Sequence, residues 1–292
     1  MFLEICEKLG FPSEACCVLS KCCEELDGNP ALQEWMAEAE ESLLEPGSEK
    51  YLDLYQKISE ESGIHRYIVD MVMLIKAVVP LKERYAQKDL PEQLLWDSIT
   101  DLRYKMLECH AVYGIWGSFV TPWFKKFYLC ELFQLGRLQY EKIVYDQPTF
   151  RDSVKTGDVV LSCHIPSSGA LLMEDVLESF RLAHDFYKND YPSGILPVFC
   201  HSWLMYPPHY EQVFPEDSNL HKFYELFEII NFAEQENNGD FWRVFHVPFS
   251  PEALEQAVGD TRLRRNFLRF LKAGNKMGNG RGMLLFDGQK IL

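Results

Sequence analysis

The first 130 residues carry apolar side chains every three to four positions, the spacing that places them on one face of a helix. The turn sequences "DGNP" and "EPGS" separate the first three segments. Pro80, in the longest segment, has no N–H for a helical hydrogen bond, so we expect a kink or a helix end there. The expected helices cover residues 12–26, 31–44, 49–62, 64–87 and 90–114. No strand-like alternation is convincing in this half, which is therefore predicted to be all helical.

The pattern changes near Phe133, where short apolar runs with alternation begin to appear between helical segments. The expected strands are 135–145, 157–166, 195–206, 240–249 and 282–288. The expected helices between them are 171–189, 218–232, 250–258 and 260–274. This order of strands and helices predicts an α/β sheet domain. We therefore predict a helical N-terminal domain over residues 1–132 and a second domain over residues 133–292.

Two of the expected strands end in the same dipeptide, Cys-His, in "LSCHIPSSGAL" and "VFCHSWLMYPP". Successive residues of a strand point to opposite faces, so Cys163 and His164 cannot act on one atom together, and neither can Cys200 and His201. If the two strands are neighbours in similar register, the histidines share one face and the cysteines the other. The cysteines, which lie in the runs "VVLSC" and "VFC", are expected to be buried. We take His164 and His201 as catalytic candidates, with structural histidines as the alternative.

The loop after the first Cys-His pair joins a strand to a helix. In that order, backbone N–H groups and the positive end of the helix dipole face a docked anion. Ser167 and Ser168 add hydroxyl donors, and Gly169 permits close approach of a ligand. We take these three residues as candidates for binding an anionic cofactor, with an ordinary helix-capping turn as the alternative.

A glycine-rich stretch, "KAGNKMGNGRGMLLF", resembles a phosphate-binding loop in composition. Its polarity is reversed, because phosphate loops run from strand to helix whereas this one runs from helix to strand. We expect it to form a turn in which Gly274 ends the helix. Arg281 stays a candidate for contact with an anionic ligand, since residues 261–286 hold seven Lys/Arg and no acidic residue.

Composition narrows the classes of partner. The formal net charge of −15 disfavours nucleic acid and anionic membranes as partners. The chain shows no signal peptide and no run of about 18 apolar residues, so we expect a cytoplasmic protein. Nine cysteines occur without any Cys-x-x-Cys spacing. In "EACCVLSKCCEEL", Cys16 and Cys23 share a helix face while Cys17 and Cys22 point away on either side, so no metal site is expected.

The segments "LGRLQYE", "LSCHIPSSGAL", "FCHSWLMYP", "EDSNLHKFYELF" and "GNGRGMLLF" together resemble a family of bacterial two-domain, N-acyltransferase-like proteins. The resemblance covers essentially the whole chain. It implies a helical N-terminal domain followed by a mixed β-sheet domain flanked by helices, of the GNAT type, the N-acetyltransferase fold that uses acyl-CoA. The usual Gln/Arg-x-x-Gly-x-Gly/Ala loop for the CoA pyrophosphate is not found in this sequence.

The resemblance implies an acyl-CoA-dependent N-acyltransferase acting on a small-molecule amine. In this reading His164 or His201 deprotonates the amine, and Ser167, Ser168, Gly169 and Arg281 contact the acyl-CoA. The alternative is a non-catalytic GNAT-like protein that binds a ligand or another protein. A hydrolase with a Cys/His site is a third hypothesis. The sequence identifies neither the acyl donor nor the acceptor, and it does not determine the oligomeric state.

Overall fold

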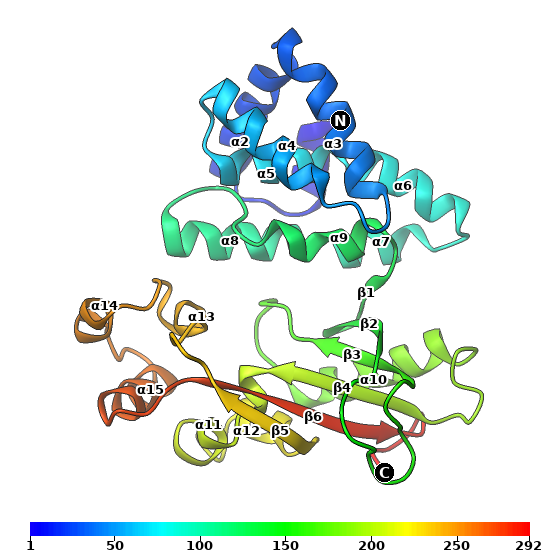
Figure 1. Cartoon of the computed structure of the whole chain (residues 1–292), viewed down its shortest axis with the longest axis vertical. Helices are drawn as coiled ribbons and strands as arrows, with labels where there is room; N and C mark the ends of the chain where they lie inside the picture. Colours follow the sequence, from blue (N-terminus) through cyan, green and yellow to red (C-terminus); the bar gives the residue numbers. More distant parts are fainter. The chain divides into compact units, whose positions relative to one another are not determined.

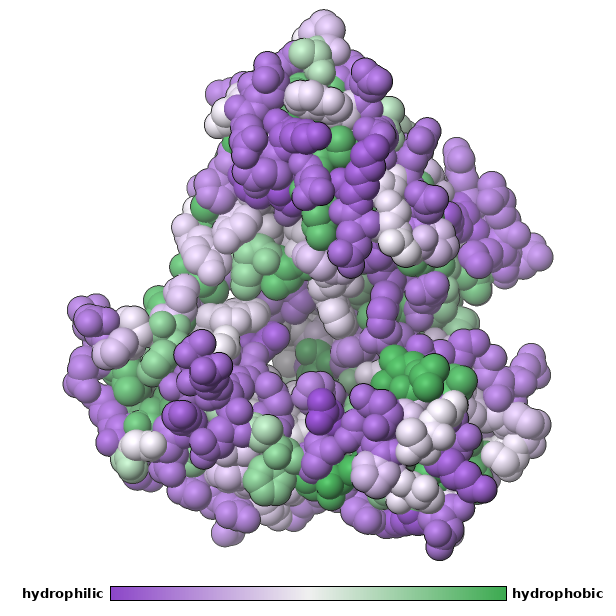
Figure 2. All heavy atoms as spheres, viewed as in Figure 1, coloured by the Kyte–Doolittle hydropathy of each residue, from purple (hydrophilic) through white to green (hydrophobic).

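The computed structural model describes all 292 residues and divides them into two compact units, Met1–Phe133 and Gln134–Leu292. The first unit is helical and the second is built on a β-sheet, as expected from the change of pattern near Phe133. Polar and charged side chains occupy most of the surface visible in Figure 2, and apolar residues appear in separate patches. No helix is long and apolar enough to cross a membrane.

The first unit contains nine α-helices and two short 3₁₀ turns. The α-helices are α1 (Phe2–Lys8), α2 (Ser13–Asp27), α3 (Gln33–Leu44), α4 (Lys50–Ser62), α5 (Arg66–Lys76), α6 (Val78–Gln87), α7 (Glu92–Ile99), α8 (Asp101–Tyr113) and α9 (Lys125–Tyr128). The 3₁₀ turns are η1 (Pro30–Leu32) and η2 (Thr121–Phe124).

Helix α5 forms the centre of this unit, because every residue from Val69 to Ile75 is buried. A helix that is buried on all sides must be surrounded by others, and α5 contacts α1, α2, α4 and α6. The break between α5 and α6 falls at Ala77, which leaves Pro80 in the first turn of α6. The prediction that the helix ends near Pro80 is confirmed, and the first turn is where proline costs least.

The cysteines of α2 behave as small apolar residues. Cys16 and Cys23 are buried, whereas Cys17 is exposed and Cys22 is partly exposed, as the helical spacing predicts. Burial raises the pKa of the Cys23 thiol to about 11, so it stays protonated near neutral pH.

The second unit contains a sheet of six strands. They are β1 (Leu132–Leu135), β2 (Leu138–Val144), β3 (Val159–His164), β4 (Leu196–Ser202), β5 (Glu228–Glu234) and β6 (Gly278–Phe286). The helices are α10 (Met173–Tyr187), α11 (Pro207–Gln212), α12 (Asn219–Tyr224), α13 (Phe241–Phe245), α14 (Pro251–Gln256) and α15 (Arg262–Lys272), with a 3₁₀ turn η3 (Trp203–Met205).

The strand order is β1-β2-β3-β4-β6-β5, and Figure 1 shows the strands in this order across the unit. Strands β3 and β4 are parallel, while the pairs β2/β3, β4/β6 and β5/β6 are antiparallel. The sheet is therefore mixed, and helices flank it. This confirms the expected fold class, a helical N-terminal domain followed by a GNAT-like mixed sheet domain.

Three segments differ from the sequence prediction. The strand expected over 135–145 is strand β2 from Leu138 to Val144, but its start belongs to β1 and to a turn at Gly136, where φ is +72°. The segment 240–249 is not a strand but contains the short helix α13, whose buried residues Phe241 and Val244 are three positions apart. The helix expected over 218–232 ends at Tyr224, and its second half is strand β5, which pairs with β6. Short apolar runs fit the helical and the strand periodicity equally well, and in these segments strand pairing and side-chain packing determine which structure forms.

The two faces of the sheet are covered differently. On one face, α10 packs its Phe180 ring 5.8 Å from Phe286 of β6, and its Ser179 hydroxyl lies 3.0 Å from Tyr140 Oη of β2. On the other face, an apolar cluster covers the region near the start of β3 and β4. Its buried members are Tyr145, Phe150, Val154, Val160, Phe199, Met283 and Leu285.

Three glycines of the glycine-rich stretch, Gly278, Gly280 and Gly282, lie within strand β6 rather than in a turn. A side chain at Gly280 would place its Cβ 1.8 Å from the Met205 carbonyl oxygen. At Gly278 a Cβ would meet the Tyr206 ring at 2.5 Å, and at Gly282 it would meet Phe227 Cβ at 2.9 Å. These alternate positions face one side of β6, so the glycines let η3 and Phe227 pack directly on the strand. Gly274 follows the end of α15 with φ +88°, in agreement with the expected turn.

Candidate functional site

Strands β3 and β4 are paired over only part of their length. Their register consists of Leu161 with Val198 and Ser162 with Phe199. Beyond these residues β3 continues to His164 and β4 continues to Ser202, so the carboxyl ends of the two strands are not joined by further pairing. Carboxyl ends of adjacent parallel strands are where α/β sheets commonly bind ligands. This opening is the candidate site.

The register places His164 and His201 on the same face of the sheet, two residues beyond the paired Ser162 and Phe199. His164 is the last residue of β3, beyond the paired residues, and a carboxylate lies beside it. Its Nε2 is 2.8 Å from Oε1 of Glu141, a residue of β2 that is only 8% exposed. A carboxylate held against an imidazole fixes the ring orientation and stabilises its protonated form. The sequence alone does not single out Glu141, because the pairing of β2 with β3 is not visible in a sequence.

His201 is paired across the sheet with Arg281 of β6. Loss of solvent contact lowers the pKa of His201 below its ordinary value, and the charge of Arg281 lowers it further. The residue as a whole is nevertheless exposed to solvent. Because the neutral form is favoured, His201 can accept a proton near neutral pH.

Arg281 also contacts the edge strand β5. Its Nη1 donates to Oδ1 of Asn231 at 3.2 Å, and Asn231 Nδ2 in turn donates to Oε1 of the buried Gln147. We refer to Glu141, His164, His201, Arg281 and Asn231 as the polar row, because the strand registers place all five on one face.

Cys163 and Cys200 lie on the opposite face from the histidines, as alternation predicts. Both are buried, with exposures of 1% and 0%. Burial raises the pKa of Cys163 well above its ordinary value, and the neighbouring Cys200 thiol raises it further. A thiol buried away from solvent is a poor nucleophile, which argues against the Cys/His hydrolase hypothesis.

The loop that carries Ser167, Ser168 and Gly169 runs directly from β3 to α10. Neither serine caps the helix, since the residue that precedes its first turn is Leu172 and no side chain caps it. Glu174 and Asp175 in the first turn already offset the helix dipole. An anion at this loop would therefore depend on the N–H groups of the loop itself rather than on the dipole.

Arg137 is a site residue that the sequence did not reveal. It follows Gly136 in the β1–β2 turn, and its guanidinium donates three hydrogen bonds to the loop after β3. Nη1 donates to the Pro166 oxygen at 3.1 Å, Nη2 to Gly169 at 2.9 Å and Nε to Ala170 at 3.0 Å. Residues about 30 positions apart are joined here, and no local pattern in the sequence announces such a contact.

The structure does not bring all the predicted site residues to one place in the sheet. Ser167–Gly169 follow β3, whereas Arg281 lies within β6 as part of the polar row, with β4 between the two strands. Arg281 is therefore placed beside the histidines rather than in the loop. No group of three or more His, Cys, Asp or Glu side chains is arranged to hold a metal ion.

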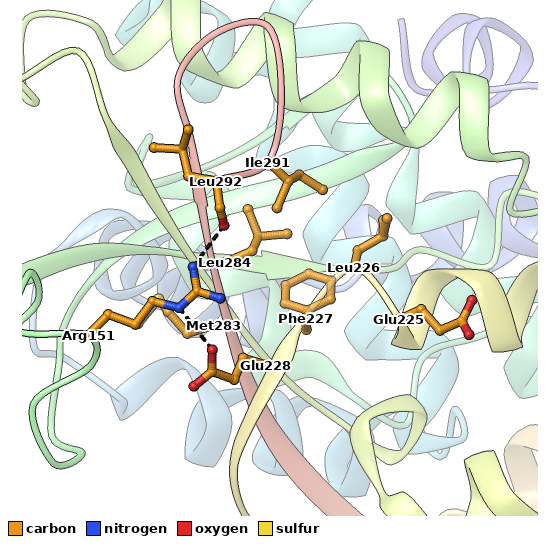
Figure 3. A pocket seen from close by; sticks show the side chains of 9 residues that line it. All are labelled: Arg151, Glu225, Leu226, Phe227, Glu228, Met283, Leu284, Ile291 and Leu292. Atoms are coloured by element: carbon orange, nitrogen blue, oxygen red, sulfur yellow. Dashed lines mark hydrogen bonds and ion pairs between the residues drawn. The ribbon is translucent and has the colours of Figure 1, made fainter.

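A separate pocket of about 290 Å³ lies elsewhere in the second unit (Figure 3). Its lining includes Met283 and Leu284 of β6 and the start of β5, and Arg151 in the lining pairs with Glu228 at 2.9 Å. Leu284 pairs with Val198, on the amino-terminal side of the residues where β3 and β4 separate. The pocket contains none of the polar row, so we do not assign it to the candidate site.

Comparison with known proteins identifies the family. Residues 132–284 match the model of the GNAT-like C-terminal domain, and residues 2–130 match the N-acyltransferase N-terminal domain. No curated protein is significantly similar to the chain. The chain belongs to the two-domain family of N-acyltransferase-like proteins, which confirms the resemblance found in its sequence.

Solved structures share the fold over almost the whole chain. One is an acyltransferase in complex with decanoyl-CoA and teicoplanin, with a TM-score of 0.74 and 20% identity over 96% of this chain and 86% of that one. Another is an acyltransferase in complex with decanoyl-CoA, with a TM-score of 0.73 and 22% identity over the same shares of the two chains. At this level of identity the likeness establishes the fold.

Proposed function

We propose that the chain is an acyltransferase that transfers the acyl group of an acyl-CoA to the amine of a small molecule. The observation that carries the proposal is the separation of β3 and β4 beyond Ser162 and Phe199, in a chain that belongs to this family by both halves. His164 of the polar row directly precedes the loop that follows β3, and His201 has the equivalent position on β4. The similar acyltransferase structures, which contain decanoyl-CoA and in one case teicoplanin, support an acyl-CoA donor and a small-molecule acceptor.

The proposed reaction is direct attack of the amine nitrogen on the thioester carbonyl carbon. A tetrahedral intermediate forms, the C–S bond breaks, and CoA leaves with the proton that the amine loses. His164 is the proposed base, since Glu141 at 2.8 Å stabilises the imidazolium that forms when it accepts the proton. His201, whose lowered pKa keeps it neutral, is the second catalytic candidate and can relay the proton toward the leaving sulfur.

The proposed cofactor contacts are Ser167, Ser168 and Gly169, which directly follow β3. The phosphate groups of an acyl-CoA whose thioester lies at the ends of β3 and β4 would reach this loop. The sequence lacks the usual Gln/Arg-x-x-Gly-x-Gly/Ala loop, but this does not contradict the assignment. A loop that contains a glycine and runs from a strand to a helix is present between β3 and α10, although not after β4. Arg281 is assigned to the polar row near the reacting carbonyl, where it can contact negative charge that develops on oxygen.

Binding and turnover are tested separately. Calorimetric titration with acetyl-CoA, octanoyl-CoA and decanoyl-CoA measures donor binding. Release of free CoA thiol in the presence of a panel of small amines, including amino sugars, measures transfer, and mass spectrometry of the product identifies the N-acyl bond. Absence of binding for all three donors at millimolar concentration would exclude the proposal. Binding without transfer to any amine would instead favour the non-catalytic alternative.

A further inference from the structure

The loop between β3 and α10 is held from one side by a single side chain. Arg137 donates to the carbonyl oxygens of Pro166, Gly169 and Ala170 at distances between 2.9 and 3.1 Å. The planar guanidinium presents several donors in fixed directions, which suits it to gather three carbonyl groups. All three peptide units are thereby fixed in orientation.

The orientation of these carbonyls determines where the N–H groups point. In a trans peptide the C=O and N–H bonds point in opposite directions, and the chain contains no cis peptide bond. The peptide units bonded to Arg137 carry the N–H groups of Ser167, Ala170 and Leu171, which therefore point away from the guanidinium. No acceptor within the protein takes the N–H of Ala170 or Leu171. Successive N–H groups on one side of a loop form a concave site for an anion.

The backbone on either side of Arg137 is fixed as well. Ser179 of α10, which is completely buried, accepts a hydrogen bond from the Leu138 N–H at 3.1 Å and donates to the Leu135 carbonyl oxygen. The turn that carries Arg137 is therefore attached to the same helix that the loop enters. Gly136 allows this contact, since a Cβ there would lie 3.1 Å from Leu182.

We propose that Arg137 is a positioning residue for the pyrophosphate of acyl-CoA, acting by turning the N–H groups of the Ser167–Leu171 loop toward the phosphates. This inference rests on the proposed function and adds to it the residue that prepares the loop. Arg137 acts through the loop backbone and needs no contact with the ligand itself. Its charge adds a long-range attraction for phosphate, but the three-carbonyl contact is the part that lysine cannot reproduce.

The test uses the full chain and two ligands that differ in the pyrophosphate. Octanoyl-CoA contains it, and octanoyl-pantetheine lacks the pyrophosphate and nucleotide while keeping the thioester arm. Titration calorimetry with Arg137→Ala and Arg137→Lys is expected to show a dissociation constant for octanoyl-CoA raised about tenfold or more, with that for octanoyl-pantetheine changed less than about twofold. Arg181→Ala, which removes an exposed arginine paired with Glu178 on α10, is the matched control and is expected to leave both constants unchanged.

Three results would overturn the inference. Wild-type affinity of both Arg137 variants for octanoyl-CoA would show that ligand binding does not need the hydrogen bonds from Arg137 to the loop. An equal loss of affinity for the two ligands would show that Arg137 supports the fold of the second unit as a whole. Wild-type affinity of Arg137→Lys for octanoyl-CoA would show that only the charge of Arg137 matters. Failure of the wild-type protein to bind octanoyl-CoA would instead contradict the proposed function. If Arg137→Ala does not fold, as judged by circular dichroism melting, Arg137→Lys decides the question.

Discussion

Glu141 Oε1 and His164 Nε2 lie 2.8 Å apart across strands β2 and β3, with the carboxylate almost fully buried and the imidazole at the opening between β3 and β4. A buried carboxylate beside a partly exposed histidine is the arrangement by which proteins orient a general base. The two residues are 23 positions apart in the chain, and only the antiparallel register brings them together.

Replacing His164 tests its role in proton transfer. His164→Asn keeps a polar side chain but cannot take a proton near neutral pH, so kcat is expected to fall about 100-fold or more, with KM for acyl-CoA nearly unchanged. Glu141→Gln is expected to lower kcat less than His164→Asn, because the amide can still hold the ring by a hydrogen bond but carries no charge to stabilise the imidazolium formed in the reaction. Steady-state release of CoA measures both. An unchanged kcat in His164→Asn would remove His164 from the mechanism.

The environment of His201 can be tested by NMR titration. Burial and the charge of Arg281 both lower its pKa, so Arg281→Gln is expected to raise the His201 pKa toward its ordinary value. The chemical shifts of the imidazole carbons followed against pH report the change. Arg181→Gln, a change of equal charge on α10, is expected to leave the His201 titration unaffected, and equal shifts in the two variants would contradict the specific contact.

Gly169 and Gly157 provide a matched pair for the loop. Both have positive φ, +105° and +96°, and a Cβ at either position would meet nothing within 4 Å. Each alanine substitution is therefore expected to cost about 1–3 kcal/mol of backbone strain and no steric clash. Only Gly169→Ala is expected to weaken binding of octanoyl-CoA, by about tenfold, because only this residue lies in the proposed phosphate loop. Equal affinities of the two variants would contradict the loop assignment.

His209 is expected to make stability depend on pH. It is fully buried among Tyr206, Phe267 and Phe270, and burial lowers its pKa from 6.5 to about 4. Between these values the unfolded chain binds a proton that the folded chain does not. The titration of His209 therefore does not affect the free energy of unfolding above pH 6.5. As the pH falls from 6.5 toward 4, the free energy of unfolding decreases by up to about 3 kcal/mol because the unfolded chain binds the proton.

Urea unfolding of the wild type and His209→Phe at pH 7, 5 and 4 measures this contribution. The variant loses the hydrogen bond from Nδ1 to the Trp203 carbonyl, at 2.9 Å, and is expected to be less stable at pH 7. The stability difference between the two proteins should shrink as the pH falls. A constant difference over this range would show that His209 does not titrate as stated.

Gly280 is expected to tolerate no side chain. Because its Cβ would lie 1.8 Å from a backbone oxygen of Met205, Gly280→Ala must displace η3 from β6 and is expected to destabilise the second unit by about 3 kcal/mol or more. Thermal unfolding measures the change. Asn279→Ala, the neighbouring position in the same strand, serves as the control and is expected to cost less than about 1 kcal/mol. Similar losses at the two positions would argue against the close contact.

The sequence determined the features that depend on local periodicity. Spacing of apolar residues predicted the helical first unit and the helix break near Pro80. Alternation placed the histidines and cysteines of the two Cys-His pairs on opposite faces, which the register confirms. The sequence pattern also led to the family. It failed where short apolar segments fit two periods, as in α13 and β5, because pairing with β6 and burial of Phe241 outweigh such weak local preferences.

Only the tertiary structure decided which distant residues meet. Three features depend on segments more than 20 residues apart in the chain. They are the partial pairing of β3 with β4, the contact of Glu141 with His164 and the three hydrogen bonds from Arg137 to the loop. Strand order and register set these contacts, and a linear pattern does not encode them. The glycines of β6 show the same division. Their composition resembled that of a phosphate loop, whereas their neighbours reveal that the space beside the strand is already filled by the protein.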